Sequence, residues 1–149
     1  MPTSKRPRRS YRPRLVNVPV TAGLVEMFEE CFTLAETGLH LRAPTAEHFD
    51  AIATCLNTIG PVALVRFGPK HEYTIAMSSA ALAMNAAADR AAARRADGNP
   101  EALERMYDHE LGAVSRGLDA ARQALPYLDV RALAVQRSRI SAMAAEAVA

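Results

Sequence analysis

The residues with the clearest chemistry are ten consecutive positions near the start of the chain, residues 5–14, which read KRPRRSYRPR. The planar fork of arginine donates two hydrogen bonds to one phosphate. Neutralising several phosphates also releases condensed counterions, which provides affinity without base specificity. Prolines keep such a segment extended, and Tyr11 can stack on an unpaired base. The segment therefore predicts nucleic-acid contacts through Lys5, Arg6, Arg8, Arg9, Tyr11, Arg12 and Arg14.

Charge is divided unevenly along the chain, which leaves other partners open for this segment. Residues 1–14 hold six basic and no acidic residues, whereas residues 15–149 hold 12 basic and 16 acidic residues, so the net charge of +2 hides a basic arm on an acidic body. The arm also suits an acidic protein surface, the acidic body of the chain itself, or a role as a solubilising tail.

A second basic cluster consists of Arg90, Arg94 and Arg95. Arg90 and Arg94 are four residues apart and share one face of a helix, where an alanine-rich surface could lie along a phosphate backbone. Positive charge near the C-terminal end of a helix also suits its dipole, and the pattern favours this solvated face. The three arginines remain candidate nucleic-acid contacts.

Motifs for catalysis and for metal binding are missing from the sequence. No glycine-rich phosphate loop, His-Glu-x-x-His, Cys-x-x-Cys or Glu-x-x-His occurs. The histidines are not spaced three or four residues apart; they are His40, His48, His71 and His109. We expect no catalytic residue, no metal and no cofactor, and hence a protein that is not an enzyme.

The two cysteines, Cys31 and Cys55, lie in apolar helical patterns. In a reducing compartment we expect both to be buried small hydrophobic residues rather than a disulfide. Polar and charged residues interrupt the alanine-rich run 77–96, and residues 15–20 are too short for the apolar part of a signal peptide. These features favour a cytoplasmic protein that does not contact a membrane.

The arm is expected to cover residues 1–20, and an all-α domain residues 21–149, as an irregular bundle of about five helices. The first helix is expected to begin at Thr21 and end at Gly38, and the second to begin at Thr45. Gly60-Pro61 interrupts the second pattern. Residues 62–67 then either continue the helix through the proline, which we favour, or form a short buried strand.

The later helices have clear boundaries. A long alanine-rich helix is predicted over residues 70–97, and Gly98 is its expected stop. Asn99-Pro100-Glu101 predicts the start of a fourth helix. Pro126 is expected to end that helix, and Asp129 to cap a fifth.

The fourth helix carries an apolar seam at near-heptad spacing, formed by Leu103, Tyr107, Leu111, Val114, Leu118 and Leu125. Alanine makes up 30 of the 149 residues. Alanine lets neighbouring helices approach closely but removes little area from water, so we expect a thin core. The seam is expected to be part of that core, with a homodimer contact as the alternative.

The start of the chain resembles the opening of small phage and prophage proteins that begin with a basic Tyr-Arg-Pro-Arg segment and continue as helices. The matching residues are Tyr11-Arg12-Pro13-Arg14, followed by residues 18–24. The resemblance implies a phage accessory context and identifies no site. We expect a nucleic-acid-associated binding protein, with a protein-binding inhibitor or adaptor, for instance an anti-defence factor, as the alternative.

Overall fold

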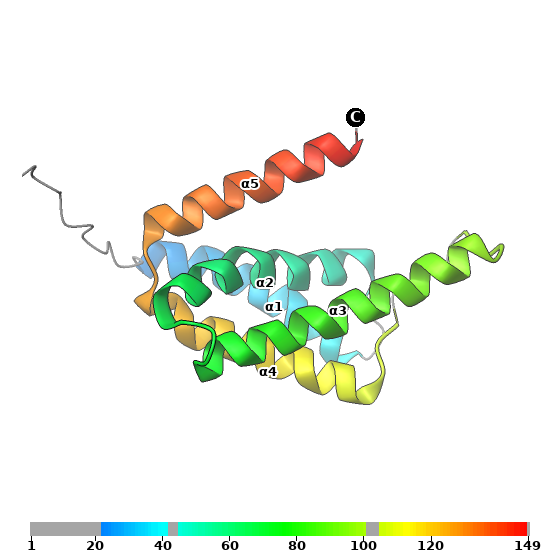
Figure 1. Cartoon of the computed structure of the whole chain (residues 1–149), viewed down its shortest axis with the longest axis horizontal. Helices are drawn as coiled ribbons and strands as arrows, with labels where there is room; N and C mark the ends of the chain where they lie inside the picture. Colours follow the sequence, from blue (N-terminus) through cyan, green and yellow to red (C-terminus); the bar gives the residue numbers. More distant parts are fainter. Residues whose placement is uncertain (1–21, 42–44, 101–104, 149) are drawn as a thin grey trace, which may run out of the picture.

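The expected all-α architecture is confirmed by a computed structural model that describes residues 22–41, 45–100 and 105–148. Five α-helices and one short 3₁₀ helix follow one another, with no strand among these residues; they are α1 (Ala22–His40), α2 (Ala46–Phe67), α3 (Glu72–Ala96), α4 (Asp108–Ala124), η1 (Leu125–Tyr127) and α5 (Val130–Val148). Helices α1–α4 form the body, and α5 runs along one side of it and diverges toward its end (Figure 1). The arm, Thr21 and Leu103 lie outside the described residues.

Helix α2 is continuous through Pro61, as we favoured, and no strand follows it. Its start is set by Thr45, whose backbone N–H donates to Nδ1 of His48 at 3.1 Å. Its end is set by Gly68, which adopts a φ of +87° that side-chain-bearing residues rarely adopt. The helix that contains an internal proline is also the one that supplies much of the core.

Two predicted boundaries are wrong. Gly38 does not stop α1, because the helix continues to His40. A Cβ at Gly38 would lie 2.5 Å from Cβ of His48, so the glycine allows α1 and α2 to approach closely. The fourth helix begins at Asp108 rather than at Asn99-Pro100, and residues 105–107 are not helical.

The core lies between α1, α2, α3 and α4. Its largest fully buried side chains are Phe32, Ile52, Ile59, Val114, Leu118, Leu125 and Leu128. Helix α3 contributes Met77, Met84 and a row of buried alanines. Helix α5 contributes Leu133 as its one buried residue. Three residues of the predicted seam, Val114, Leu118 and Leu125, are therefore part of the internal core.

Alanine and glycine set the spacing between α3 and α4. Ala80 is fully buried, and a Cβ added at Gly117 would overlap the Cβ of Ala80 and lie 3.2 Å from the backbone oxygen of Ala76. The two helices are thus close enough that only a glycine fits at this crossing. The close approach expected for the alanine-rich helix is confirmed here.

Candidate functional site

Arg90, a predicted phosphate contact, is committed to a partner within the chain. Its Nη1 donates to Oε1 of Glu110 at 2.7 Å, and its Nη2 donates to Oε2. The same Nη2 donates to the backbone oxygen of Arg105 at 2.8 Å. The guanidinium also lies over the ring of Tyr107, with Cζ 4.1 Å from the ring centre. Two of its edges are occupied, so Arg90 joins α3 to α4 rather than presenting a free fork to phosphate.

Glu110 is buried, with 4% of its surface exposed. Its Oε2 also accepts a hydrogen bond from the backbone N–H of Tyr107 at 2.8 Å, which caps the start of α4. The Arg90 guanidinium is the main reason that the pKa of the Glu110 carboxyl lies below its ordinary value, although burial opposes the shift. The ion pair and the cap together hold the start of α4 at Asp108. The sequence pattern predicts an earlier start, at Asn99-Pro100.

The other predicted site residues are spread over the molecule. Arg94 and Arg95 lie in the last turn of α3, and both have interaction partners within the chain. In the seam, Val114, Leu118 and Leu125 are at most 1% exposed, so the dimer alternative is wrong for these three residues. Tyr107 is 56% exposed and precedes α4, and Leu111 is partly exposed. The structure therefore does not unite these residues in one site.

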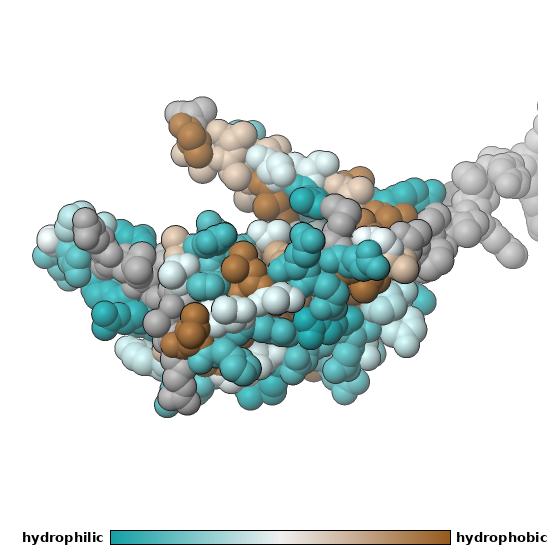
Figure 2. All heavy atoms as spheres, turned by 180° about the vertical axis from the view of Figure 1, so that it is seen from behind, coloured by the Kyte–Doolittle hydropathy of each residue, from teal (hydrophilic) through white to brown (hydrophobic). Residues whose placement is uncertain are grey.

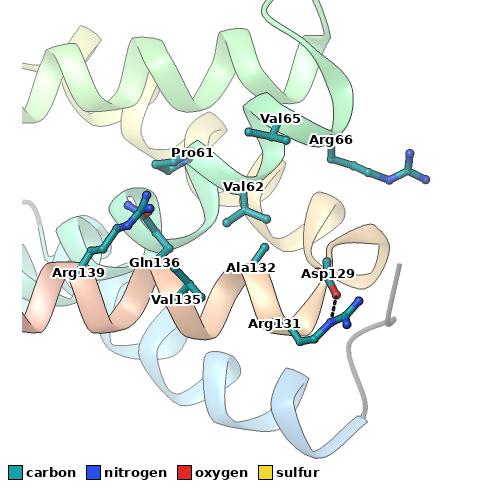
Figure 3. Close-up of a pocket in the computed structure, with 10 residues that line it drawn as sticks. All are labelled: Pro61, Val62, Val65, Arg66, Asp129, Arg131, Ala132, Val135, Gln136 and Arg139. Carbon is teal, nitrogen blue, oxygen red and sulfur yellow. Dashed lines mark ion pairs between the residues drawn. The ribbon is translucent and has the colours of Figure 1, made fainter. Parts of the chain in front are cut away.

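A hollow with a volume of about 610 Å³ lies between α2 and α5. Its apolar lining, called the floor below, comes from Pro61, Val62 and the exposed Val65 on α2 and from Ala132 and Val135 on α5. Figure 3 shows Val62, Ala132 and Val135 between the two helices, with Gln136 and Arg139 reaching from α5 toward Pro61. We call this surface the α2–α5 groove.

Pro61 creates the polar link between the two helices. Proline has no backbone N–H, so the helical hydrogen bond to the carbonyl of Asn57 cannot form. Gln136 of α5 donates its Nε2 to this carbonyl at 3.0 Å. The hydrogen bond missing from α2 is thereby replaced by one from α5, whose donor Gln136 lies 79 residues beyond Asn57 in the chain.

The rim of the groove is basic. Arg66, Arg131 and Arg139 line it together with a single acidic residue, Asp129. Asp129 pairs with Arg131 at 3.6 Å, and Nε of Arg66 donates to the backbone oxygen of Tyr127 at 3.3 Å. Arg139 forms no ion pair within the described part of the chain. The groove therefore carries net positive charge on a body that is acidic overall.

An aromatic cluster lies at the end of α2. The ring of Phe67 lies 4.6 Å from that of His71, 5.4 Å from that of Tyr73 and 6.4 Å from that of Tyr127. Nδ1 of His71 accepts the backbone N–H of Tyr73 at 3.1 Å and so caps α3. The rings pack on one another and hold the turn between α2 and α3 in place.

Exposed apolar residues continue beyond the groove along α5. Val135, Met143 and Val148 are 54%, 69% and 90% exposed. Figure 2 shows the end of α5 standing away from the body at the upper left, with hydrophobic atoms along it. Exposed apolar surface rimmed by polar residues is typical of an interaction site, so the groove and the adjoining face of α5 form the candidate site.

Helix α2 is long and apolar enough to cross a membrane by length and composition, and it is the one such helix among the described residues. Its side chains Ile52, Cys55 and Ile59 are fully buried in the body, and helices that run through a protein core have the same composition. Within the described residues, no group of three or more His, Cys, Asp or Glu side chains is arranged to hold a metal.

Comparison with protein-family models finds no match, and comparisons with curated proteins and with solved structures find none either. The groove residues were not singled out by sequence patterns. The one signal for them is Pro61 within an apolar helix, because it leaves a carbonyl unpaired. Gln136, which donates to this carbonyl, has no feature in the sequence that distinguishes it from a solvated residue.

Proposed function

We propose that the chain is a non-enzymatic binding protein that holds an acidic, amphipathic segment of a partner protein in the α2–α5 groove. The observation that carries the proposal is the combination of an apolar floor with a rim of three arginines and one aspartate. Amphipathic helices bind in such grooves through apolar anchors spaced by one helical turn. Arginine is enriched at protein interfaces, where it pairs with carboxylates.

The apolar and charged residues of the groove together favour a protein partner over nucleic acid. A floor of valine, proline and alanine requires apolar side chains on the partner, and Arg139 requires an opposite charge beside them. Nucleic-acid interfaces are more polar and more strongly basic than this one. This combination favours the adaptor or inhibitor function over binding of phosphates alone.

The test is photo-crosslinking from a residue analogue placed at Val135 in the full chain, in a bacterial lysate treated with nuclease. We expect a protein adduct that is lost in Arg139→Glu and in Val65→Asp, an exposed residue of the groove, when the crosslinker stays at Val135. The matched control is a crosslinker at Leu82, which is an apolar residue 70% exposed on α3. An adduct of equal yield at both positions, or one that forms only when the nuclease treatment is omitted, contradicts the proposal.

A second candidate function is nucleic-acid association through the basic arm, in a phage accessory context. It is supported by the six basic residues within residues 1–14 and by the resemblance at Tyr11-Arg12-Pro13-Arg14. It predicts binding to DNA or RNA that weakens steeply with salt. Replacing Arg8, Arg9, Arg12 and Arg14 by alanine should abolish that binding, whereas Arg139→Glu should change it little. Unchanged affinity in the arm variant contradicts this candidate.

A further inference from the structure

Two cysteines that are 24 residues apart in sequence meet between α1 and α2. The Sγ of Cys55 donates to the Sγ of Cys31 at 3.3 Å, and the Sγ of Cys31 lies 3.4 Å from the backbone oxygen of Ala51. Both thiols are free in this structure. A disulfide holds its sulfurs about 2.05 Å apart, so a movement of about 1.3 Å would join them.

The two thiols differ in access and in acidity. Cys55 is fully buried, whereas Cys31 is partly exposed. The hydrogen bond from Cys55 lowers the pKa of Cys31 to about 7 despite burial, and Arg137 of α5 adds to this effect. The same hydrogen bond and burial raise the pKa of Cys55, with Glu36 acting in the same direction and Arg122 opposing it. A thiolate that solvent can reach is the reactive form of cysteine.

We propose that Cys31 and Cys55 form a redox site, in which Cys31 reacts with low-molecular-weight disulfides such as oxidised glutathione and Cys55 completes an intramolecular disulfide. The inference is independent of the α2–α5 groove and of any partner held there. It differs from the expectation of two buried small hydrophobic residues because the sulfur atoms are adjacent and Cys31 is partly exposed.

The chemistry proceeds in two exchanges. The Cys31 thiolate attacks one sulfur of oxidised glutathione, forms a mixed disulfide and releases one glutathione thiolate. Cys55 then loses its proton, its sulfur attacks the Sγ of Cys31, and the second glutathione thiolate leaves. The two thiols of the chain are oxidised and one glutathione disulfide is reduced to two thiols, with the two protons taken up by the released thiolates.

The experiment uses the reduced full chain, incubated with oxidised glutathione at pH 7 and then alkylated and analysed by mass spectrometry. We expect a peptide pair linked through Cys31 and Cys55. In Cys55→Ala we expect a stable mixed disulfide of one glutathione at Cys31, and in Cys31→Ala we expect Cys55 to stay unmodified. Absence of the linked pair in the folded wild-type chain overturns the proposal.

Two measurements on the wild-type chain do not depend on how well the variants fold. Limited alkylation of the reduced protein should label Cys31 many times faster than Cys55; equal rates contradict the assigned roles. Oxidation should also raise the thermal unfolding midpoint, because a crosslink between α1 and α2 restricts the unfolded chain. A linked pair that lowers the midpoint would show that the fold opposes the bond, and would also overturn the proposal.

Discussion

Helix α4 packs against α3, and helix α5 packs against α2, but the two contacts differ in what lies between the helices. Between α3 and α4, a glycine faces a buried alanine so closely that no further carbon fits. Between α2 and α5 there is a groove of about 610 Å³. Helices α3 and α4 are as close as their backbones allow, whereas α2 and α5 leave a groove between them that other atoms could fill.

The polar links differ in the same way. The α3–α4 link is a two-pronged ion pair, in which the Glu110 carboxylate also caps its own helix. The α2–α5 link is a single amide from Gln136 to the carbonyl of Asn57. Loss of a buried charge partner leaves the other charge unpaired, whereas loss of an exposed amide leaves a carbonyl that water can reach. We therefore expect structural roles on α3–α4 and binding roles on α2–α5.

Arg90→Ala should have the largest effect on stability. It leaves the buried Glu110 carboxylate without its partner, and we expect a loss of about 3 kcal/mol, measured by urea unfolding at pH 7. The control is Arg116→Ala on α4, an exposed arginine whose removal should cost below about 0.5 kcal/mol. Equal losses in the two variants would contradict a structural role for Arg90.

The same ion pair predicts how stability varies with acid. The pKa of Glu110 is lower in the folded chain than its ordinary value of 4.5, which we take for the unfolded chain. The ionised carboxylate therefore stabilises the fold fully above that ordinary pKa. This stabilisation is lost as the pH falls toward the pKa of the folded chain. The wild-type chain should lose more stability than Arg90→Ala between pH 5 and pH 3, roughly the window of carboxylate titration. Parallel curves for the two proteins would contradict this assignment.

Gly117→Ala should have the next largest effect. The added Cβ overlaps Ala80, and we expect a loss of about 2 kcal/mol from overpacking. Gly112→Ala on the same helix is the matched control, because the added Cβ meets only the mobile end of Arg116 at 3.4 Å. That control should gain about 0.5 kcal/mol from helix propensity. Thermal unfolding of both variants measures the difference, and a stable Gly117→Ala would contradict the close crossing.

Pro61→Ala should act in opposite directions on the two regions. The new N–H competes for the Asn57 carbonyl, so α2 gains about 1 kcal/mol, a part of the roughly 3 kcal/mol by which alanine exceeds proline in a helix. Helix α5 should exchange its amide hydrogens faster because it loses its acceptor. Gln136→Leu should reproduce the faster exchange without stabilising α2. Slower exchange of α5 in Pro61→Ala would contradict the link.

Valine at two positions provides the smallest and sharpest comparison. Val135→Ser in the groove should change stability by less than about 0.5 kcal/mol while abolishing capture of the partner. Val114→Ser, at a fully buried position on α4, should cost about 2 kcal/mol or more. Urea unfolding and the crosslinking yield measure both effects. A large stability loss at Val135 would assign the groove to the core.

Local patterns predicted the helices well and the site poorly. The apolar stripe of α2 and the Gly98 stop of α3 depend on nearby residues, so sequence spacing indicates them. The start of α4 depends on Arg90 reaching Glu110, and the attachment of α5 depends on a glutamine 79 residues from its acceptor. Contacts of this kind have no periodicity. The proximity of the two cysteines was missed for the same reason.

The crossing of Ala80 and Gly117 also has a consequence for how the sequence can drift. Every replacement at Gly117 adds atoms where there is no room, and at Ala80 every residue except glycine does the same. A larger residue at either position requires a compensating change at the other or a greater distance between the two helices. The alanines of α3 therefore favour a helix and also permit the short distance between α3 and α4. The exposed valines of the groove, Val65 and Val135, have no such limit, so we expect them to vary while the body stays unchanged.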